Sequence, residues 1–439
     1  MFSFSLSIFG CQMNYADAEI ITASLQKIGG QKIPLSPQSD VIIVVSCGVR
    51  QGAEERIINW TQKLRQKNSA AIIILTGCLS HRVDIQERLA FTNIFFTPIN
   101  RWSEQIKKLT TIFQPEITSN GSCQDDFYSI KADYSSHYRA YLPIVTGCNN
   151  FCAYCVVPYA RGPEISRSPE LLLAEITKLI KKGYKEIFLL GQNVNSYQGL
   201  DQKKQKWNFA RLLRAINAIP GNFWIRFLSS HPKDLDQNFI ETLQNCPKIS
   251  RQLHLPIQSG SNRILAKMNR RYTREDYFEI IKQIRASIPN IILSTDILVG
   301  FPNESEADFQ DSLTLVKKVG FEKLYALKYS PRPETAAYLY PDNVSTKTKK
   351  KRQQILDQTW QKIAEKQNQK YLNREIIILI DKIQKKADQK WIIGKNLDNK
   401  DVIGVISNKT KTPKIGQWAK IKIEQTGSLG LRGKFISAF

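Results

Sequence analysis

Short apolar runs that alternate with helical segments constrain the fold of this 439-residue chain more than any other feature. Between residues 142 and 329, strands are expected at 142–146, 186–190, 224–228, 252–256, 291–298 and 323–329. The helices that separate them are expected at 169–182, 209–218, 237–246, 274–287 and 304–319. Strands joined by helices pair in parallel. The segment therefore predicts an incompletely closed (β/α)6 barrel, with its active groups in the loops that follow the strands.

The first 115 residues repeat this alternation on a smaller scale. Strands are expected at 4–9, 41–45 and 71–75, and helices at 16–28 and 52–67. The β-branched run at 41–45 is typical of a strand that is buried on both faces. This part of the chain predicts a small parallel α/β domain, which a polar connector at 115–136 joins to the barrel.

A basic helical segment at 346–374 follows the barrel, and short strands come after it. The strands are expected at 375–381, 391–394, 402–406, 419–424 and 434–436, with glycines and lysines between them. Such a series predicts a small all-β barrel of a kind that binds oligonucleotides. We therefore predict an α/β protein with three domains, at 1–115, 134–367 and 369–437.

Three cysteines crowd into eight residues at the start of the predicted barrel. Cys148, Cys152 and Cys155 are spaced as Cys-x3-Cys-x2-Cys and directly follow the first barrel strand. Thiolates are the ligands that iron–sulfur clusters prefer. Three ligands leave one coordination position open, as reactive metal sites require. Zinc is the structural alternative, although zinc ligands usually come in two separated pairs.

Three more cysteines lie in the first eighty residues, each just after one predicted strand. They are Cys11, Cys47 and Cys78. All strand C-termini of an open parallel sheet lie along one edge, where ligands bind. Topology should thus bring the three thiols together as a second metal site; the alternative is three small packing residues. Cys123 and Cys246 lie outside both patterns, and we interpret them as incidental thiols.

The chain is strongly basic, with 63 Lys and Arg against 39 Asp and Glu and a formal net charge of +24. This excess favours a polyanionic partner, with nucleic acid first and an acidic membrane surface second; composition drift is the alternative. No apolar run is long enough to span a membrane, and we expect no membrane association. Free thiols indicate a reducing cytoplasm. The run Lys349, Lys350, Lys351 and Arg352 is the candidate RNA-binding surface, although a lysine run is also typical of a solvated helix face.

The cysteine triplet resembles that of the radical S-adenosylmethionine superfamily. In that family a 4Fe-4S cluster binds the amino and carboxylate groups of S-adenosylmethionine and cleaves it to a radical, so the cofactor carries the difficult step. The resemblance places Tyr154, just before the third cysteine, near the adenine of the cofactor.

The resemblance narrows further to methylthiotransferases, over about residues 4–437. Phe9-Gly10-Cys11-Gln12-Met13-Asn14, Cys47 and Thr76-Gly77-Cys78 match their amino-terminal domain. The segments 155–162 and 191–197 look like the MiaB-type tRNA branch, and the final barrel is similar to an RNA-binding TRAM domain. The chain departs from the pattern at Ser46 and Asn303, where Thr and Gly are usual, and at Leu79-Ser80-His81.

This resemblance implies an activity and its components. The enzyme would methylthiolate C2 of N6-isopentenyladenosine, at position 37 beside the tRNA anticodon, using two S-adenosylmethionine molecules and two 4Fe-4S clusters. It would need tRNA, a flavodoxin- or ferredoxin-like electron donor and a sulfur source, and we expect a monomer. The alternatives are threonylcarbamoyladenosine of tRNA or a ribosomal-protein aspartate as substrate, and a non-catalytic iron–sulfur RNA-binding or electron-transfer protein.

Polar residues near the ends of the barrel strands are further candidates for cofactor binding. In relatives the segment that contains Gly300 faces S-adenosylmethionine. His254 is expected to pack in the core. The cofactor-binding candidates are Gln192, Asn193, Ser229, Ser230, Gln258, Asp296 and Gly300.

Overall fold

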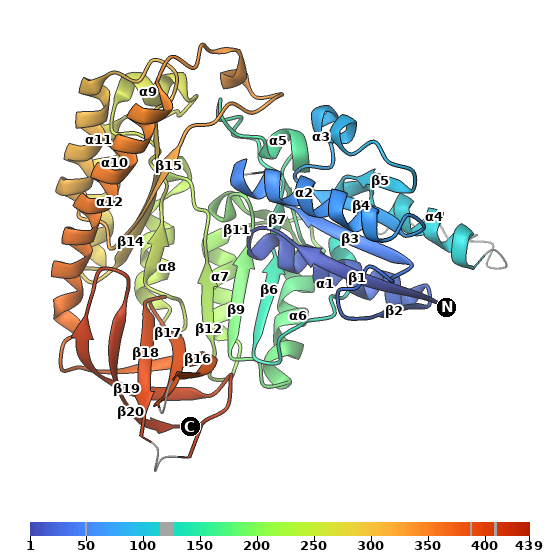
Figure 1. Ribbon diagram of the computed structural model, residues 1–439. Coiled ribbons are helices and arrows are strands. Elements are labelled where there is room, and N and C mark those ends of the chain that lie inside the picture. The colour runs from blue at the N-terminus through green and yellow to red at the C-terminus, as the bar shows by residue number, and fades with distance from the viewer. Residues whose placement is uncertain (49–50, 115–126, 387–388, 408–410) are drawn as a thin grey trace.

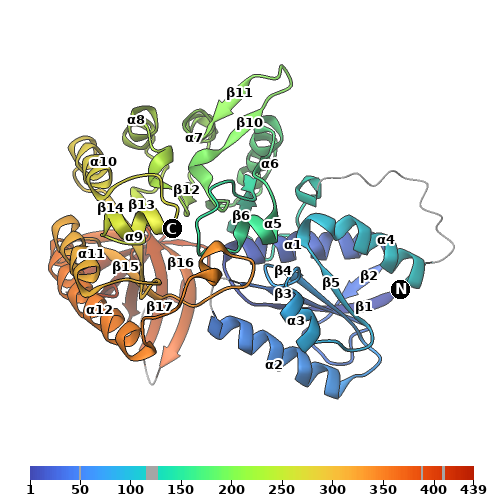
Figure 2. The same ribbon diagram turned by 90° about the horizontal axis from the view of Figure 1, so that it is seen from above.

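The computed structural model describes residues 1–48, 51–114, 127–386, 389–407 and 411–439. It contains an amino-terminal α/β domain, a central partial barrel and a small closed carboxyl-terminal barrel (Figure 1). Seen from above, the amino-terminal domain lies beside the central barrel (Figure 2). This arrangement confirms the predicted fold class. No helix among the described residues is long and apolar enough to cross a membrane.

The amino-terminal domain is built on one parallel sheet with the strand order β2-β1-β3-β4-β5. Its strands are β1 (Phe2–Ile8), β2 (Gly30–Lys32), β3 (Val41–Ser46), β4 (Ile72–Gly77) and β5 (Ile94–Thr97). Its helices are α1 (Gln12–Lys27), α2 (Gln51–Lys67), α3 (Val83–Arg88) and α4 (Trp102–Phe113). Helices α1 and α4 cover one face, and α2 and α3 the other. Strands β2 and β5 and helices α3 and α4 were not predicted from the sequence, and α1 begins four residues earlier than expected.

The central barrel has six parallel strands. They are β6 (Arg139–Pro143), β9 (Glu186–Leu190), β12 (Trp224–Phe227), β13 (Gln252–His254), β14 (Ile292–Val299) and β15 (Lys323–Lys328). They form two ladders, β12-β9-β6 and β13-β14-β15, and a parallel bridge between Ile225 and Ile249 lies between them. The prediction of a partial (β/α)6 barrel is confirmed.

Helices cover the outer face of this barrel. They are α6 (Pro169–Lys181), α7 (Phe209–Ala218), α8 (Gln237–Asn245), α10 (Arg274–Ser287), α11 (Glu306–Val319) and α12 (Thr346–Asn368). Two short helices, α5 (Val157–Arg161) and α9 (Asn262–Lys267), lie in loops. Two short pairs, β7 (Val145–Thr146) with β8 (Ile165–Ser166) and β10 (Gln198–Leu200) with β11 (Lys206–Asn208), complete the central domain.

The amino-terminal domain packs against the inner face of the barrel at its open side. Phe188 and Leu190 of β9 belong to the same apolar cluster as the buried residues of α1. Side chains alternate between the two faces of a strand, so the opposite face of β9, with Ile187 and Leu189, packs under the outer helices.

The carboxyl-terminal barrel closes in the strand order β16-β17-β18-β20-β19. Its strands are β16 (Glu375–Lys386), β17 (Gln389–Asn396), β18 (Asp401–Ile406), β19 (Trp418–Thr426) and β20 (Leu431–Ala438), longer than the expected segments. Its contact with the central barrel includes Trp418, which is buried with its ring centroid 4.3 Å from that of Trp224.

Candidate metal and cofactor site

The triplet of thiols lies in the loop between β7 and α5. Gly147 begins this loop with φ +77°, and a Cβ there would lie 2.0 Å from the Pro163 carbonyl oxygen, so only glycine fits. The Cys155 amide donates to the Cys152 carbonyl at 2.9 Å. Burial first, and the neighbouring Cys152 next, raise the pKa of the Cys155 thiol to about 12. A bound cation would relieve this cost, because it stabilises the thiolate form.

One buried cation already faces this triplet. The Arg270 guanidinium donates from Nη1 to the Cys152 sulfur at 3.6 Å and from Nη2 to the Pro256 carbonyl at 2.9 Å. Arg270 was not among the predicted site residues. It lies three residues beyond α9, a helix that was also not predicted, and it belongs to no regularly spaced motif such as that of the cysteines.

A cavity of about 760 Å³ opens beside the triplet. Its lining includes Tyr154, Gln258 and Asp296, and it also includes Gly48 of the amino-terminal domain. Gln258 has φ +74°, and its amide donates to the Asp296 carbonyl at 2.9 Å. The cavity therefore lies between the triplet loop, the carboxyl ends of β14 and β15, and the loop after β3. Three predicted cofactor contacts meet here, although Asp296 lies within β14 and not beyond it.

The remaining candidates lie outside the described lining of this cavity. Gln192 and Asn193 follow β9, and Ser229 and Ser230 follow β12. Three buried atoms in these loops have no hydrogen-bond partner, namely Oε1 of Gln192, Oδ1 of Asn193 and Oγ of Ser230. Buried polar groups are normally paired, so these loops have spare capacity for a polar ligand.

The second group of thiols gathers at the carboxyl edge of the amino-terminal sheet. Cys11 caps α1, and Cys47 and Cys78 follow β3 and β4. A Cβ built on Gly10 would lie 2.7 Å from Cβ of Cys47, and one on Gly48 would lie 3.3 Å from Cβ of Cys78. The three loops are therefore in direct contact, as the topology predicted. Burial and then the neighbouring Cys78 raise the pKa of the Cys11 thiol.

Two of the residues that depart from the family pattern, Ser46 and Asn303, have a structural interpretation. The Ser46 hydroxyl donates to the Thr76 carbonyl at 2.5 Å and accepts from the Leu79 amide at 3.0 Å, so a serine here still joins the loops that carry Cys47 and Cys78. Asn303 has φ +63°, a left-handed conformation that glycine adopts without strain and that asparagine tolerates better than most residues.

Two buried ion pairs join the amino-terminal domain to the barrel. Arg161 of α5 lies 2.6 Å from Asp17 of α1, and its Nη1 donates to the Tyr128 hydroxyl at 3.1 Å. Arg332, after β15, lies 2.5 Å from Glu54 of α2. Helix α5 follows the triplet and α1 begins after Cys11, so the first pair directly links the two groups of thiols.

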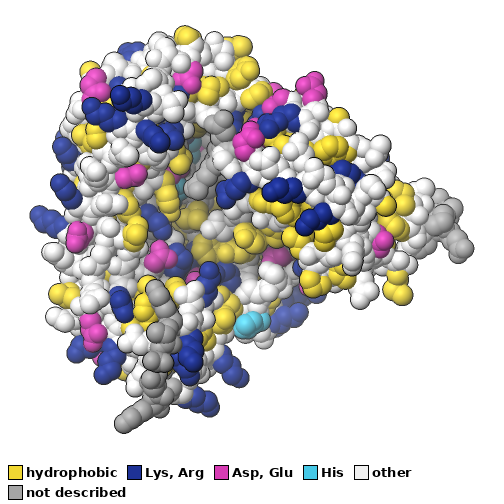
Figure 3. Space-filling view, in the orientation of Figure 1, with side chains coloured by type: hydrophobic (Ala, Val, Ile, Leu, Met, Phe, Trp, Pro, Cys, Tyr) yellow, Lys and Arg dark blue, Asp and Glu magenta, His cyan; other side chains and the backbone are white. Residues whose placement is uncertain are grey.

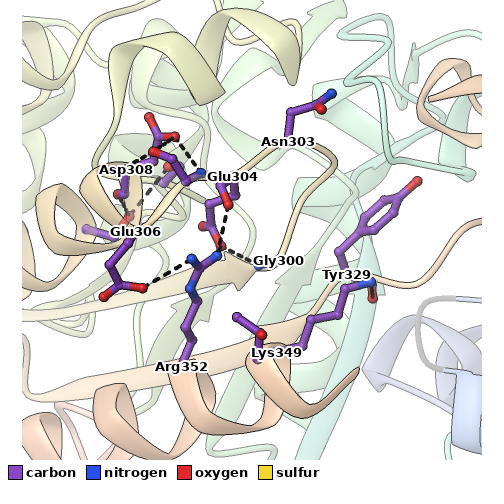
Figure 4. A network of polar contacts seen from close by, with 12 residues as sticks. Gly300, Asn303, Glu304, Glu306, Asp308, Tyr329, Lys349 and Arg352 are labelled. Carbon is purple, nitrogen blue, oxygen red and sulfur yellow. Dashed lines mark hydrogen bonds and ion pairs between the residues drawn. The ribbon is translucent and has the colours of Figure 1, made fainter. Parts of the chain in front are cut away.

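The interpretation of the basic run as an RNA surface is wrong for two of its four residues (Figure 4). Lys349 and Arg352 are buried and face the central barrel. Lys349 lies 2.6 Å from Asp342 and lines the cavity beside Tyr154, and Arg352 lies 2.6 Å from Glu304. Lys350 and Lys351 are exposed.

Gly300 lies in the same network and not in the described lining of the cavity (Figure 4). It has φ +71°, and a Cβ there would lie 2.3 Å from Cγ of Lys349. Its amide donates to Glu304 at 2.6 Å. Gly300 therefore permits the close approach of α12 that positions Lys349.

The donor sets fit iron–sulfur clusters, because each group consists of three free thiols and thiolates are the ligands that such clusters prefer. Within the described parts of the chain, no three His, Cys, Asp or Glu side chains converge tightly enough to hold one metal ion. Cys246 is buried in the main core, as expected of an incidental thiol, and Cys123 lies outside the described residues. His254 is half-buried and lines a smaller cavity between the central and carboxyl-terminal barrels, so the expectation that it packs in the core is wrong.

Known proteins match the chain along most of its length. The radical SAM superfamily model matches residues 142–316, and that of the uncharacterized protein family UPF0004 matches residues 3–95. A tRNA-2-methylthio-N(6)-dimethylallyladenosine synthase from Clostridium tetani is 38% identical over 99% of this chain and 96% of the relative. One from Thermoanaerobacter sp. is 36% identical over 99% of this chain and 92% of the relative.

Solved structures agree on the fold. The radical S-adenosylmethionine methyltransferase TsrM from Kitasatospora setae, solved with cobalamin and a [4Fe-4S] cluster, superimposes with a TM-score of 0.55 at 14% identity. The superposition covers 76% of each chain. The full-length relatives establish that the chain belongs to the tRNA-2-methylthio-N(6)-dimethylallyladenosine synthase family of radical S-adenosylmethionine enzymes.

Proposed function

We propose that the protein transfers a methylthio group to C2 of N6-isopentenyladenosine at position 37 of tRNA. The observation that carries this proposal is the match to relatives of this activity over 99% of the chain, through all three parts of the fold. The cofactors are S-adenosylmethionine and two 4Fe-4S clusters. The contact of the loops that carry Cys11, Cys47 and Cys78 supports a dedicated second site, which a radical initiator alone would not need.

We assign one cluster to Cys148, Cys152 and Cys155 and the other to Cys11, Cys47 and Cys78. A cluster held by the three thiols of the triplet would supply the electron for the cleavage of S-adenosylmethionine. Arg270 places a positive charge beside Cys152, where it faces the sulfur of that ligand. Tyr154, Gln258 and Asp296 would contact the cofactor in the adjoining cavity, and Gln192, Asn193, Ser229 and Ser230 remain further candidates.

Several components of the reaction remain proposals. We propose a flavodoxin- or ferredoxin-like reductant, a separate sulfur source, and a monomeric enzyme in the cytoplasm. We also propose the domain limits 1–115, 134–367 and 369–437. The exposed Lys350 and Lys351 remain candidates for RNA contact.

The substrate is tested with anaerobically reconstituted enzyme, S-adenosylmethionine and dithionite. The RNAs are anticodon stem-loops that carry either isopentenyladenosine or threonylcarbamoyladenosine, and a ribosomal protein is the third substrate. We expect mass spectrometry to find the methylthio group on the first RNA alone. A methylthio product found only on another substrate would contradict the proposed substrate. If no mixture yields 5′-deoxyadenosine, the radical mechanism is wrong.

The ligand assignment has its own test. Wild-type protein should carry about eight irons, and the triple Ala variant of Cys11, Cys47 and Cys78 about four, on the arithmetic of two four-iron clusters. A matched Cys246→Ala variant should keep all eight, because Cys246 lies in the core away from both groups. If the triple variant binds as many iron atoms per chain as wild type, the assignment of a second cluster to these three cysteines is wrong.

A further inference from the structure

The loop that carries the triplet has an inner and an outer side. On the inner side, Tyr154 and Cys155 line the cavity where the cofactor is proposed to bind. Phe151, which directly precedes Cys152, lies outside the described lining of that cavity and is 53% exposed. A partner can therefore approach the cysteine ligands from the outer side without entering the cavity.

Phe151 is held in an unfavourable backbone conformation. Its φ is +45°, a region that bulky residues rarely adopt. The Asn269 side chain donates to the Phe151 carbonyl oxygen at 2.8 Å, and the Ala153 amide donates to the Met268 carbonyl oxygen at 3.0 Å. The segment after α9 thus fixes the triplet loop. Strained residues persist only where their surroundings fix them, and they are common at functional sites, so the exposed ring is a candidate contact for a partner.

Three more exposed apolar side chains lie around this loop. The Tyr159 ring of α5 is exposed, and its centroid lies 6.2 Å from that of the Phe151 ring. The Ala337 amide donates to a carbonyl oxygen of the triplet loop at 2.7 Å, which places the next two residues, Tyr338 and Leu339, beside the loop. Both are exposed, Leu339 to 84%. A group of exposed apolar side chains of this kind is typical of an interaction site.

Two cations accompany these apolar side chains. Lys267 and Arg271 lie two residues on either side of Asn269, and neither has an ion-pair partner in the part of the chain that the structure describes. Acids of the neighbouring helices are engaged elsewhere: Glu275 and Asp311 pair with Arg274, Asp308 pairs with Arg263, and Asp276 caps α10. Positive charge is therefore unbalanced here, which attracts an acidic partner.

This surface lies at the end of the molecule away from the carboxyl-terminal barrel. Helix α9 and the loop after β15 lie at the top of the view in Figure 1, with α5 close by, and the carboxyl-terminal barrel lies at the bottom. In Figure 3, hydrophobic side chains lie near the top of the molecule, with Lys and Arg side chains beside them. We call this surface the outer face; its residues are Phe151, Tyr159, Lys267, Arg271, Tyr338 and Leu339.

The proposed reaction requires a partner at the triplet. Each cleavage of S-adenosylmethionine consumes one electron, which must be replaced from outside the chain. Electron tunnelling falls steeply with distance, so the redox group of the donor must come close to the triplet loop. Transient electron-transfer complexes use small interfaces, below roughly 1,200 Å², and aromatic residues are enriched in interfaces whose rim is polar. The outer face has this composition.

We infer that the outer face docks the reductant, and that this reductant is an acidic electron-transfer protein that carries a flavin. A flavin is favoured over an iron–sulfur donor because its apolar ring edge fits the exposed rings of Phe151 and Tyr159. Lys267 and Arg271 pair with carboxylates around the flavin. One electron passes from the reduced flavin to the triplet site, the flavin is oxidised by one electron, and no covalent bond forms or breaks. The inference rests on the proposed function and deepens it by naming where the reductant binds.

The experiment measures the binding of an oxidised bacterial flavodoxin to the reconstituted enzyme by isothermal titration calorimetry at several salt concentrations. The double variant Lys267→Glu, Arg271→Glu should bind about tenfold more weakly or worse, because two attractive contacts become repulsive. The matched control is Lys107→Glu, Lys108→Glu on α4, where both lysines are exposed and have no ion-pair partner among the described residues. It makes the same change in net charge at a distant site, so it should bind flavodoxin as wild type does.

The formation of 5′-deoxyadenosine separates docking from chemistry. Dithionite needs no docking site, so with it the Lys267→Glu, Arg271→Glu variant should form as much product as wild type. With limiting reduced flavodoxin it should form about tenfold less, in line with the weaker binding. Phe151→Asn removes the ring but keeps a residue that tolerates positive φ, and it should weaken flavodoxin binding about tenfold, from the loss of one buried aromatic contact. If Phe151→Asn loses iron, Leu339→Ser replaces it.

The inference and the function fail in different ways. Wild type that does not bind flavodoxin, or equal affinities of the two charge-reversal variants, would overturn the inference. A loss of affinity confined to a bacterial ferredoxin would overturn it too, because a ferredoxin carries no flavin. Methylthiolation by wild type with dithionite upholds the function in each of these cases. If wild type binds flavodoxin but does not methylthiolate with either reductant, the proposed function is wrong.

Discussion

Replacing Arg161 with methionine should loosen the amino-terminal domain from the barrel. The Arg161 guanidinium is buried, with Nη2 2.6 Å from Oδ2 of Asp17 and Nη1 donating to Tyr128 at 3.1 Å. The substitution leaves a fully buried carboxylate without its partner, which costs about 3–5 kcal/mol in comparable pairs. Asp17→Asn combined with Arg161→Met removes both charges, so we expect this double variant to recover most of the loss.

A three-domain chain does not unfold in one two-state step, so the assay must report on α1 itself. Native-state hydrogen exchange, read by mass spectrometry, gives the free energy of local opening for α1 peptides. This opening free energy should fall by about 3–5 kcal/mol in Arg161→Met. The control Arg88→Met breaks an exposed ion pair with Glu55. It should change the opening free energy of the α1 peptides by no more than about 1 kcal/mol. Equal values for wild type and Arg161→Met would refute the role of this pair.

Three further predictions concern single residues. Gly147→Ala should lower the iron content by about four atoms, because a Cβ would collide with the Pro163 carbonyl; Gly183→Ala, with φ +89° and open space around it, should keep its iron. Asn303→Ala should lower the melting temperature and Asn303→Gly should not, because alanine tolerates φ +63° poorly. Burial lowers the pKa of Lys400 to about 8, below the roughly 10.4 of an unfolded lysine. The unfolded state then binds more protons between these values, so the urea midpoint of the transition that unfolds the carboxyl-terminal barrel should rise with pH there, and Lys400→Met should abolish the rise.

Much of the barrel could be predicted because its local signals agree with one another. Helices α7 and α10 have the expected limits, since Asn208 caps the first and Thr273 forms a capping box with Asp276 in the second. Strand β14 has eight residues, five of them apolar. The missed strand β2 has only three residues, two of them exposed, so neither alternation nor a buried run marks it.

The basic run was misinterpreted although the sequence contained the correcting signal. Successive residues of a helix point about 100° apart, so four consecutive basic residues cannot all face the solvent on one side. Lys349 and Arg352 share a face with Leu356 and Trp360, at the i, i+3 and i+7 spacing of a buried stripe. A helical-period analysis of α12 would have assigned these two residues to the interior and left Lys350 and Lys351 outside.

The spacing between the two groups of thiols has no comparable local signal. Cysteine positions after strands predict which thiols gather, because strand ends share one edge of a sheet. How far one group lies from the other depends on ion pairs between residues distant in sequence: Asp17 with Arg161, and Glu54 with Arg332. No periodicity relates such partners, and a buried pair is recognisable only once both elements are placed. The same holds for Lys395 and Asn399, which line a cavity with Tyr141 and Tyr325 of the barrel strands only because the carboxyl-terminal barrel docks against the central one. Sequence patterns therefore predict which thiols gather in each domain, whereas docking between the domains determines how the two groups of thiols are placed relative to each other.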